Sequence, residues 1–356
     1  MTARVDVLQV VTDTDRRGPQ VFSLELERAL AARGWSVRTV ALAPGAADGG
    51  LPLPNLGARR FRPGTLGTLA RETGRARVVI GHGSSTLPAL AAATLAGRTR
   101  FIHRNLGEPM YWANDPLRRT RTRLLLTRPD VVVALWEGAA RELVRELGVG
   151  RRRVRIIPRG ASGERFVPTD AAGRAGAKIE FRLDPARPVV AFVGSLSREK
   201  DPAGAVRAVA ALQDVQLLVA GHGPERPRVE ALARDLAPGR MRFLGSVVRT
   251  ERVFRAADAV VLPSRTEGIP AVLVEAGLSA VPAVATAVGG VPDVVLDGVT
   301  GRLVEPGDAP ALQEALREVL ADSGAMGEKA RAHCLERYEL ESVADRWHGL
   351  LQEVLA

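Results

Sequence analysis

Short runs of valine, isoleucine and leucine alternate with longer amphipathic stretches along the whole chain, and this alternation constrains the fold more than any other feature. In the first half the apolar runs are 5–11, 37–42, 77–82, 100–104 and 130–135. The stretches between them have helical patterns, such as residues 21–34, which end at a glycine as helices often do. Continuous apolar runs separated by helices are typical of a parallel sheet covered on both faces. The sequence therefore predicts an α/β fold.

The second half repeats the scheme. Its predicted strands are 189–196, 215–221, 241–247, 259–263, 282–286 and a short edge strand at 301–306. Residues 158–188 lie between the halves, and their prolines, glycines and weak periodicity are typical of a linker. We expect a first domain at 1–165, a linker at 166–187 and a second domain at 188–339, with a final helix at 340–356 that packs back on the first domain.

The composition fits two globular domains without disulfides. The chain has 356 residues, 46% of them hydrophobic, and one cysteine, Cys334. A single cysteine excludes an intrachain disulfide and a thiolate zinc cluster. The first residues run directly into a strand-like segment without the layout of a signal peptide. No apolar segment approaches the ~20 residues that cross a bilayer. We therefore expect a soluble cytoplasmic protein.

The net charge of +10 is unevenly distributed along the chain. Residues 1–200 hold 34 Lys/Arg and 18 Asp/Glu, a balance of +16, while residues 201–356 hold 16 and 22, a balance of −6. A basic half suggests anionic partners such as phosphates or lipid headgroups. The alternative is an arginine-rich bias spread over a solvated surface. Nucleic acid is disfavoured, because no recognition module is visible.

Two glutamates bracket an otherwise apolar segment at residues 264–277, SRTEGIPAVLVEAG. Glu267 falls in a predicted strand-to-helix loop, and Pro270 suits the first position of the following helix. The amides that open this helix are free to hold an anion. Glu275 lies about 7–8 Å further along the helix axis. The two carboxylates either accept hydrogen bonds from the hydroxyls of a nucleoside diphosphate sugar, or are a loop charge and a half-exposed helix residue.

The stretch EGIPAVLVEA, followed by VPAVATAVGGVPDVVLDGVTGRLVEPGD, resembles the nucleotide-sugar site of the glycosyltransferase family 4 type. The likeness covers most of residues 187–308 and continues more weakly through the first half. It implies the GT-B fold, in which two Rossmann-like parallel-sheet domains face a central cleft. It also implies a retaining, metal-independent transferase with no cofactor beyond its nucleotide-diphosphate sugar, for which UDP is favoured over GDP.

The resemblance also implies the roles of particular residues in the second half. Glu267 matches the glutamate that binds the donor sugar's hydroxyls, and Glu275 the one that binds the ribose. Lys200, one of three lysines in the chain, matches the cation that neutralises the departing diphosphate; the alternative is a surface lysine at a helix start. The other donor-binding residues that the resemblance implies are Gly268, Ile269, Pro270 and Leu244.

One departure from the family pattern concerns the donor phosphates. Ser195 stands where the family usually has an arginine, and Arg159 stands where relatives often have an asparagine. We hypothesise that Arg198 or Arg159 supplies the missing positive charge. Substitution of each by alanine tests this idea, since near-normal turnover in both variants would contradict it.

In the first half the resemblance implies fewer functional residues. Gly18 matches a glycine turn near the donor phosphate or acceptor. His103 resembles a histidine near the reacting sugar, although a packed core histidine is the alternative, and His82 is a weaker case. Asp13 and Asp15 form a D-x-D pattern, which we interpret as turn chemistry rather than a metal site.

The acceptor is expected in the first domain, near His82, Arg104, Tyr111 and Trp112. The two aromatic rings suit a sugar or an apolar acceptor, or pack ordinarily beneath a helix. The basic run LRRTRTR at 117–123 either docks on an anionic membrane or is a solvated face.

We interpret the chain as a retaining glycosyltransferase whose acceptor is a small molecule, a glycan or a lipid-linked compound. The alternatives are a nucleotide-sugar epimerase or hydrolase of the same fold, and a non-catalytic nucleotide-sugar-binding protein, which Ser195 keeps open. A dinucleotide-dependent oxidoreductase is disfavoured, because no G-x-G-x-x-G follows the first strand.

Overall fold

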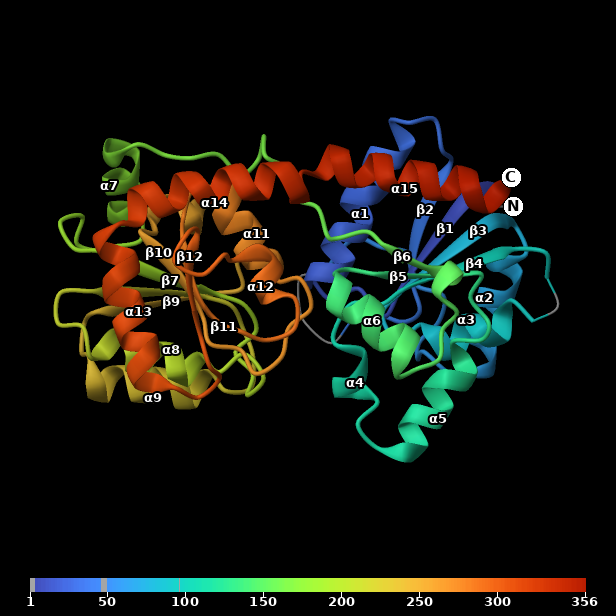
Figure 1. Ribbon diagram of the computed structural model, residues 1–356, viewed down its shortest axis with the longest axis horizontal. Helices are drawn as coiled ribbons and strands as arrows, with labels where there is room; N and C mark the ends of the chain where they lie inside the picture. The colour runs from blue at the N-terminus through green and yellow to red at the C-terminus, as the bar shows by residue number, and fades with distance from the viewer. Residues whose placement is uncertain (1–3, 46–49, 96) are drawn as a thin grey trace. The chain divides into compact units, whose positions relative to one another are not determined.

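The computed structural model describes residues 4–45, 50–95 and 97–356. The chain divides into two compact units, and each is considered by itself. Unit 1 comprises Met1–Gly160 together with Leu340–Ala356, and unit 2 comprises Ala161–Glu339. In each unit, helices cover both faces of a parallel sheet (Figure 1). The predicted α/β architecture is confirmed in both halves of the chain.

Unit 1 contains a parallel six-stranded sheet in the order β2-β1-β3-β4-β5-β6. Its strands are β1 (Val5–Val11), β2 (Val37–Ala41), β3 (Ala76–His82), β4 (Arg100–Arg104), β5 (Val131–Ala134) and β6 (Val154–Ile156). Its helices are α1 (Gly18–Ala31), α2 (Pro63–Thr73), α3 (Leu87–Ala93), α4 (Pro109–Trp112), α5 (Pro116–Leu125), α6 (Glu137–Arg145) and α15 (Leu340–Leu355). Strand β6, which we did not predict, is three residues long and half-exposed, so it lacks the apolar run that marks the others.

The last helix, α15, completes the core of unit 1. It lies beside α1 (Figure 1), and Val343, Trp347 and Leu351 are buried against the apolar side chains of α1, β3 and β4. Arg33, just after α1, forms ion pairs with Glu341 and Asp345 on α15, at 3.0 and 2.7 Å. The chain therefore returns to unit 1 after building all of unit 2.

Unit 2 contains a second parallel six-stranded sheet, in the order β12-β11-β10-β7-β8-β9. Its strands are β7 (Val189–Val193), β8 (Gln216–Ala220), β9 (Met241–Gly245), β10 (Ala259–Leu262), β11 (Ala283–Thr286) and β12 (Gly301–Val304). Its helices are α7 (Ala171–Glu180), α8 (Pro202–Ala210), α9 (Arg226–Leu236), α10 (Glu251–Ala256), α11 (Ala271–Leu278), α12 (Val291–Val294), α13 (Ala309–Ala321) and α14 (Ser323–Tyr338). As predicted, β12 lies at an edge.

The prediction of a linker at 166–187 is wrong. These residues belong to unit 2, which begins at Ala161, and they contain helix α7. The Asp170 side chain caps this helix by accepting a hydrogen bond from the Gly173 amide at 2.7 Å. Lys178 anchors it through an ion pair with Asp258 at 2.8 Å. Glycines at 173 and 176 weaken the helical pattern in the sequence, and the cap and tertiary packing on α10 outweigh them.

The order of strands decides which loops meet. In unit 2, β10 pairs with β7, although β8 and β9 come between them in the chain. In unit 1, β1 pairs with β3, and β3 with β4. Because parallel strands end at the same edge, the loops after β7 and β10 are neighbours, and so are those after β1, β3 and β4. None of the described helices is long and apolar enough to span a membrane.

Candidate functional site

The loops after β7 and β10 bring Lys200 and Glu267 together. The Lys200 Nζ lies 2.6 Å from the Glu267 Oε1, a hydrogen-bonded ion pair. The Glu267 side chain is 6% exposed, whereas that of Lys200 is 22% exposed. The pair therefore has a buried carboxylate and an ammonium that reaches solvent. An isolated buried carboxylate is costly, so the lysine offsets much of that cost.

The backbone around this pair is held in place by contacts between the two loops. The Arg265 amide donates to the Glu199 carbonyl at 2.8 Å. Next to Lys200, Asp201 has a left-handed backbone with φ of 43°, and its side chain accepts from the Gly204 amide at the start of α8. A non-glycine residue in this region is uncommon and is often found at functional sites. Lys200 is thus presented from a constrained turn.

Glu275 lies on α11 and has a partner that the sequence did not suggest. The Thr250 hydroxyl, just before α10, donates to the Glu275 Oε2 at 3.1 Å. Glu275 is partly exposed. A threonine followed by an acidic residue at a helix start was the available signal, but nothing in the sequence linked it to a residue 25 positions away.

The segment Gly268–Pro270 leads into α11 as predicted, although Pro270 is the N-cap and the helix begins at Ala271. The Gly268 carbonyl accepts from the Gly290 amide at 3.1 Å, and the Ile269 side chain is buried. In the described structure no side chain caps this helix. Its first amides therefore make no hydrogen bond to a capping side chain, as an anion site at a helix start requires.

The end of β7 carries the departure at Ser195. This residue is exposed, and its hydroxyl lies 3.2 Å from the Ser197 hydroxyl. The Arg198 side chain, 88% exposed, forms a 3.4 Å ion pair with Glu225, which also pairs with Arg228 at 2.9 Å. Hydrogen bonds from Arg228 and Arg198 hold the pKa of the Glu225 carboxyl below its usual value. Arg198 is therefore an exposed cation on the same loop as Lys200.

Close packing beside this loop requires glycine. A Cβ at Gly221, whose φ is 156°, would lie 1.7 Å from the Gly194 carbonyl oxygen. The turn after β8 thus fits directly under the end of β7, and a larger residue would displace the loop that carries Ser195 and Lys200. Leu244, on β9, is half-buried one residue before Gly245, whose carbonyl accepts from the Gly221 amide.

In unit 1, Gly18 is the first residue of α1, which begins three positions before the helical pattern predicted at 21–34. Asp13 accepts hydrogen bonds from the Gln20 side chain at 2.9 Å and from the Asp15 amide at 3.2 Å. Asp15 pairs with Arg17 at 2.6 Å. These contacts agree with turn chemistry. Among the described residues, no three His, Cys, Asp or Glu side chains gather in a group that could hold a metal ion.

His82 is a buried core histidine at the end of β3. Its Nε2 lies 3.0 Å from the Gln9 Oε1, while the Gln9 Nε2 donates to the Ser23 carbonyl and to Thr39. Because the Gln9 amide group already donates, its oxygen accepts, and the His82 Nε2 carries the proton. Burial lowers the pKa of His82 well below its usual value, with Arg104 and His103 adding to the effect. These hydrogen bonds give His82 a structural role in the core of unit 1.

His103, on β4, is also buried, and burial lowers its pKa to about 4. It is therefore neutral near pH 7. Its Nδ1 is buried without a hydrogen-bond partner in the described structure. A neutral imidazole with an unused nitrogen is able to accept or donate one further hydrogen bond.

Arg104 and Arg159 are both buried, with exposures of 1% and 5%. Burial, together with the positive charge of Arg159, lowers the pKa of Arg104 to about 9. Both belong to unit 1. Two buried like charges that affect each other are unusual in a protein interior.

Tyr111 and Trp112 lie on the short helix α4 and are 42% and 52% exposed. Their rings make an edge-to-face contact at 5.1 Å. They are not packed beneath a helix, which was one of the two expectations. The following helix, α5, has no buried residue, and it exposes Leu117 and Leu124 among its arginines.

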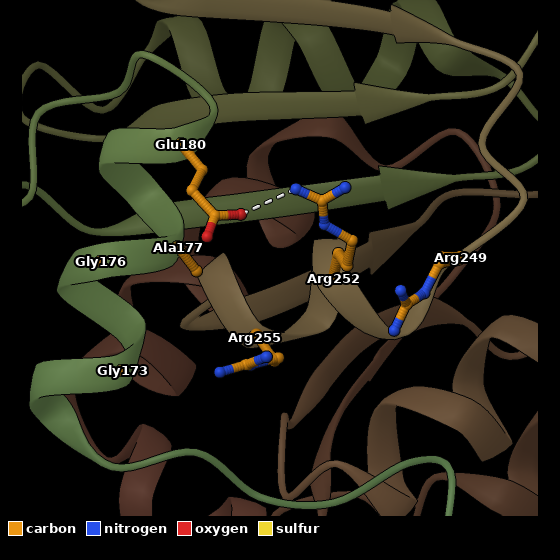
Figure 2. Close-up of a pocket in the computed structure, with 7 residues that line it drawn as sticks. All are labelled: Gly173, Gly176, Ala177, Glu180, Arg249, Arg252 and Arg255. Atoms are coloured by element: carbon orange, nitrogen blue, oxygen red, sulfur yellow. Dashed lines mark hydrogen bonds and ion pairs between the residues drawn. The ribbon is translucent and has the colours of Figure 1, made fainter.

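A separate pocket of about 340 Å³ lies in unit 2 between α7 and α10 (Figure 2). Its lining consists of Gly173, Gly176, Ala177, Glu180, Arg249, Arg252 and Arg255. Arg252 pairs with Glu180 across it at 2.9 Å. None of the residues expected to bind the donor lines this pocket, so it is distinct from the Lys200–Glu267 pair.

Two family models match the chain, one in each half. "Glycosyltransferase Family 4" matches residues 16–165, and "Glycosyl transferases group 1" matches residues 187–322. The second segment contains Lys200, Glu267 and Glu275.

Several relatives are similar to the chain over most of its length. A D-inositol 3-phosphate glycosyltransferase of Mycobacterium sp. (strain KMS) is 37% identical over 254 residues, which are 69% of this chain and 54% of that protein. The one from Nocardia farcinica is 34% identical over 289 residues, or 76% of this chain and 60% of that protein. The chain thus matches between half and two thirds of the length of these relatives.

Two solved structures share the fold. HepE of Anabaena, crystallised in complex with UDP-glucose, has a TM-score of 0.86 at 16% identity and covers 98% of this chain and 100% of its own. Sucrose-phosphate synthase of Thermosynechococcus elongatus has a TM-score of 0.84 at 23% identity, with 99% of each chain covered.

Proposed function

This chain belongs to the family 4 glycosyltransferases and has their GT-B fold, and from that membership we propose that it transfers a sugar from a nucleotide-diphosphate sugar to an acceptor. UDP is the favoured nucleotide. The observation that carries the proposal is the Lys200–Glu267 pair, at 2.6 Å, where the ends of β7 and β10 meet. A buried carboxylate for sugar hydroxyls and a lysine for phosphate are the two groups that such a donor needs.

The chemistry is chiefly electrostatic. When the bond between sugar and phosphate breaks, negative charge develops on the leaving diphosphate. Lys200 and the first amides of α11 are placed to stabilise that charge, since a lysine is an effective point charge for phosphate. Glu267 then orients the sugar, and Glu275 the ribose. The leaving phosphate takes the acceptor proton, with retention of the anomeric configuration.

In the resting protein Lys200 and Glu267 neutralise each other. We infer that donor binding exchanges these partners: the ammonium turns to the diphosphate, and the carboxylate accepts from sugar hydroxyls. The 22% exposure of the Lys200 side chain leaves it accessible to an arriving ligand, while Glu267 stays buried. Lys200 exchanges a carboxylate for a phosphate, and Glu267 exchanges an ammonium for hydroxyl donors, so each group keeps a polar partner.

The test combines donor binding with turnover. Calorimetry across UDP-, GDP-, ADP- and dTDP-sugars should show heat for at least one donor, and that donor should raise the melting temperature. Glu267→Gln should lower the transfer rate by about 10³-fold at unchanged melting temperature. Glu230→Gln serves as control, because Glu230 is an ion-paired glutamate of the same unit that lies on α9.

Each outcome bears on one alternative. No heat from any donor would refute the proposal. Free sugar or an epimer formed without acceptor would establish the hydrolase or epimerase, and donor binding without any turnover would establish a binding protein.

We also propose that unit 1 contacts anionic membranes peripherally through α5. The helix has no buried residue and no acidic residue, and it carries four arginines, at 118, 119, 121 and 123. Leu117 and Leu124 are 80% and 69% exposed on the same helix. Basic side chains beside exposed leucines are the composition of helices that lie on lipid surfaces.

A further inference from the structure

The pocket between α7 and α10 in unit 2 has a strongly basic lining. Its volume of about 340 Å³ is within the range of cavities that hold small ligands. Three arginines, at 249, 252 and 255, line it together with a single acid, Glu180. No lining residue has an apolar side chain larger than that of Ala177. A ligand that fits this pocket is therefore polar and negatively charged.

The three arginines are spaced so that they share one side of the chain. Arg249 precedes α10, and Arg252 and Arg255 follow at intervals of three residues along the helix. Positions three apart on a helix are neighbours, so like charges placed there repel each other. The residues between them, Val253 and Phe254, are buried in the core of the unit. The packing of α10 thus holds its arginines together on the side that faces the pocket.

The one acid in the lining does not balance these charges. Glu180 pairs with Arg252 at 2.9 Å. That hydrogen bond is the main cause that lowers the pKa of the Glu180 carboxyl, and the positive charge of Arg255 adds to the effect. Arg255 itself forms no ion pair with any residue that the structure describes, and Figure 2 shows no interaction between it and the other side chains drawn.

Arg249 is also short of negative charge. Its partner Glu251, at 2.8 Å, pairs at the same time with Arg165 at 3.0 Å. The pocket and its immediate partners thus contain four arginines and two glutamates, a balance of +2. The Arg252–Glu180 pair is itself half-exposed, and exposed pairs of this kind are weak. An arriving anion is therefore able to displace Glu180 at little cost.

The facing wall of the pocket, on α7, leaves room for a ligand. It consists of Gly173, Gly176 and Ala177, which have no side chain beyond a methyl group. A Cβ at Gly176 would meet nothing within 4 Å, so tight packing does not explain the glycine there. Glycine inside a helix is unfavourable compared with alanine. The open wall thus exists at the expense of helix stability.

We propose that this pocket binds a small phosphate monoester through Arg249, Arg252 and Arg255. A guanidinium group binds phosphate oxygens through paired, parallel hydrogen bonds. A monoester carries about −1.5 to −2 charges near pH 7, which matches the excess of positive charge. The cavity has space beside the phosphate for the organic part of the ligand. The inference goes beyond the proposed function, because none of the residues assigned to the donor takes part.

The first experiment uses glycerol 1-phosphate as the probe. Melting temperatures are measured at constant ionic strength, with chloride replaced stepwise by the ester. Wild-type protein should gain about 3 °C or more near saturation. The double variant Arg249→Gln/Arg255→Gln should lose most of this gain. Arg234→Gln, which changes an exposed arginine on α9 of the same unit, should keep it. An equal gain in the double variant and in wild type would overturn the proposal.

The melting temperature without the ester separates binding from a structural role. Because Arg255 has no ion pair among the described residues, Arg255→Gln should melt within about 2 °C of wild type in chloride. A variant that is destabilised by the same amount with and without the ester would show a structural role and contradict the site. Arg255→Lys keeps the charge but not the planar fork, so its affinity for the ester should fall several-fold. Unchanged affinity would refute the guanidinium contact.

A comparison of ligands defines what the pocket recognises. Glycerol 1-phosphate should bind several-fold more tightly than inorganic phosphate, because the cavity also contacts the organic part. Equal affinities would limit the site to the phosphate ion and reject the monoester.

A last pair of measurements separates this pocket from the donor site. Lys200→Ala should bind the ester within twofold of wild type, and Arg255→Gln should bind UDP within twofold. Loss of the ester response in Lys200→Ala would place the ester at the donor site and overturn the separate pocket. A wild-type protein that responds to the ester but binds no nucleotide sugar would reject the proposed function and leave the pocket standing.

Discussion

The strand ends of the two units handle buried charge in opposite ways. In unit 2, the buried carboxylate of Glu267 has Lys200 at 2.6 Å. In unit 1, Arg104 is equally buried and stacks on Phe22, with the positive charge of Arg159 near by and no ion pair to a carboxylate among the described residues. Both sets of loops follow parallel strands of six-stranded sheets. The backbone scaffold is thus the same, and the difference lies in whether the protein supplies the counter-ion.

The contrast indicates two modes of preparation for a ligand. A paired site is stable when empty, and its ligand has to replace an existing contact. An unpaired cation destabilises the empty protein, and an anion that binds it removes this penalty. We therefore expect substitutions in unit 2 to act mainly on turnover, and substitutions of the buried basic residues of unit 1 to act mainly on stability.

The largest expected effect tests the paired site. Lys200→Ala should lower the transfer rate by about 10²–10³-fold, because the diphosphate loses its cation in the transition state. It should also destabilise the protein by about 2 kcal/mol, because Glu267 is left buried without its lysine. Steady-state kinetics and urea unfolding measure the two effects. Lys329→Ala, on the exposed face of α14, is the control. If the Lys200→Ala variant keeps its activity within twofold of wild type, Lys200 is not the cation for the diphosphate, and the comparison between the two units loses its basis.

A second prediction concerns pH and the buried histidine of unit 1. The folded-state pKa of His103 is about 4, below its ordinary value of 6.5. The unfolded chain therefore binds more protons between these values, so stability is fully present above pH 6.5 and is lost as the pH falls towards 4. The loss attributable to His103 should be about 3 kcal/mol. Unfolding of wild type and His103→Asn at pH 7 and pH 4.5 measures it, with exposed His222→Gln as control. Parallel pH profiles for wild type and His103→Asn would contradict the assignment.

A smaller effect on turnover is expected for the arginine that supplies the positive charge missing at Ser195. If Arg198 supplies the missing cation, Arg198→Ala should lower turnover about tenfold, a modest value because the side chain is 88% exposed and screened by solvent. Arg228→Ala is a matched control, since Arg228 shares Glu225 with Arg198 but lies on α9. Arg159→Ala is measured in parallel, and full activity of both the Arg198 and Arg159 variants would end the compensation hypothesis.

The smallest expected effect lies on the surface of unit 1. Replacing Leu117 and Leu124 together by serine should weaken co-sedimentation with vesicles rich in anionic lipid several-fold, because two exposed apolar side chains no longer enter the interface. Leu236→Ser, at a 46% exposed leucine of unit 2, should have no effect. Equal binding of wild type to neutral vesicles would show that the arginines of α5 play no part.

The residues that the sequence could and could not identify differ in a physical way. The apolar runs predicted eleven of the strands in their places, because burial on both faces leaves a continuous pattern. Strand β6 and helix α7 were not predicted. Strand β6 is half-exposed, and helix α7 contains two glycines. Both depend on packing that local sequence does not encode.

The candidate site shows the same limit. The motif around Glu267 and Glu275 was recognisable, as was Lys200 in its own loop. That Lys200 touches Glu267 follows from β10 lying beside β7, a pairing that skips two intervening strands. Similarly, the His82–Gln9 and Glu275–Thr250 contacts join residues 73 and 25 positions apart. That no described carboxylate pairs with Arg104 could be recognised only once the surroundings of its side chain were known.

The return of α15 to unit 1 has a consequence for how the protein is made. A ribosome releases the chain from its first residue onward, so unit 2 has all its residues once Glu339 has emerged. Unit 1 starts earlier but finishes later, because Trp347 and Leu351 fill its interior. Until those side chains arrive, the apolar faces of α1 and β3 lie open in the nascent polypeptide. The half of the molecule that is synthesised first is therefore the half that matures last.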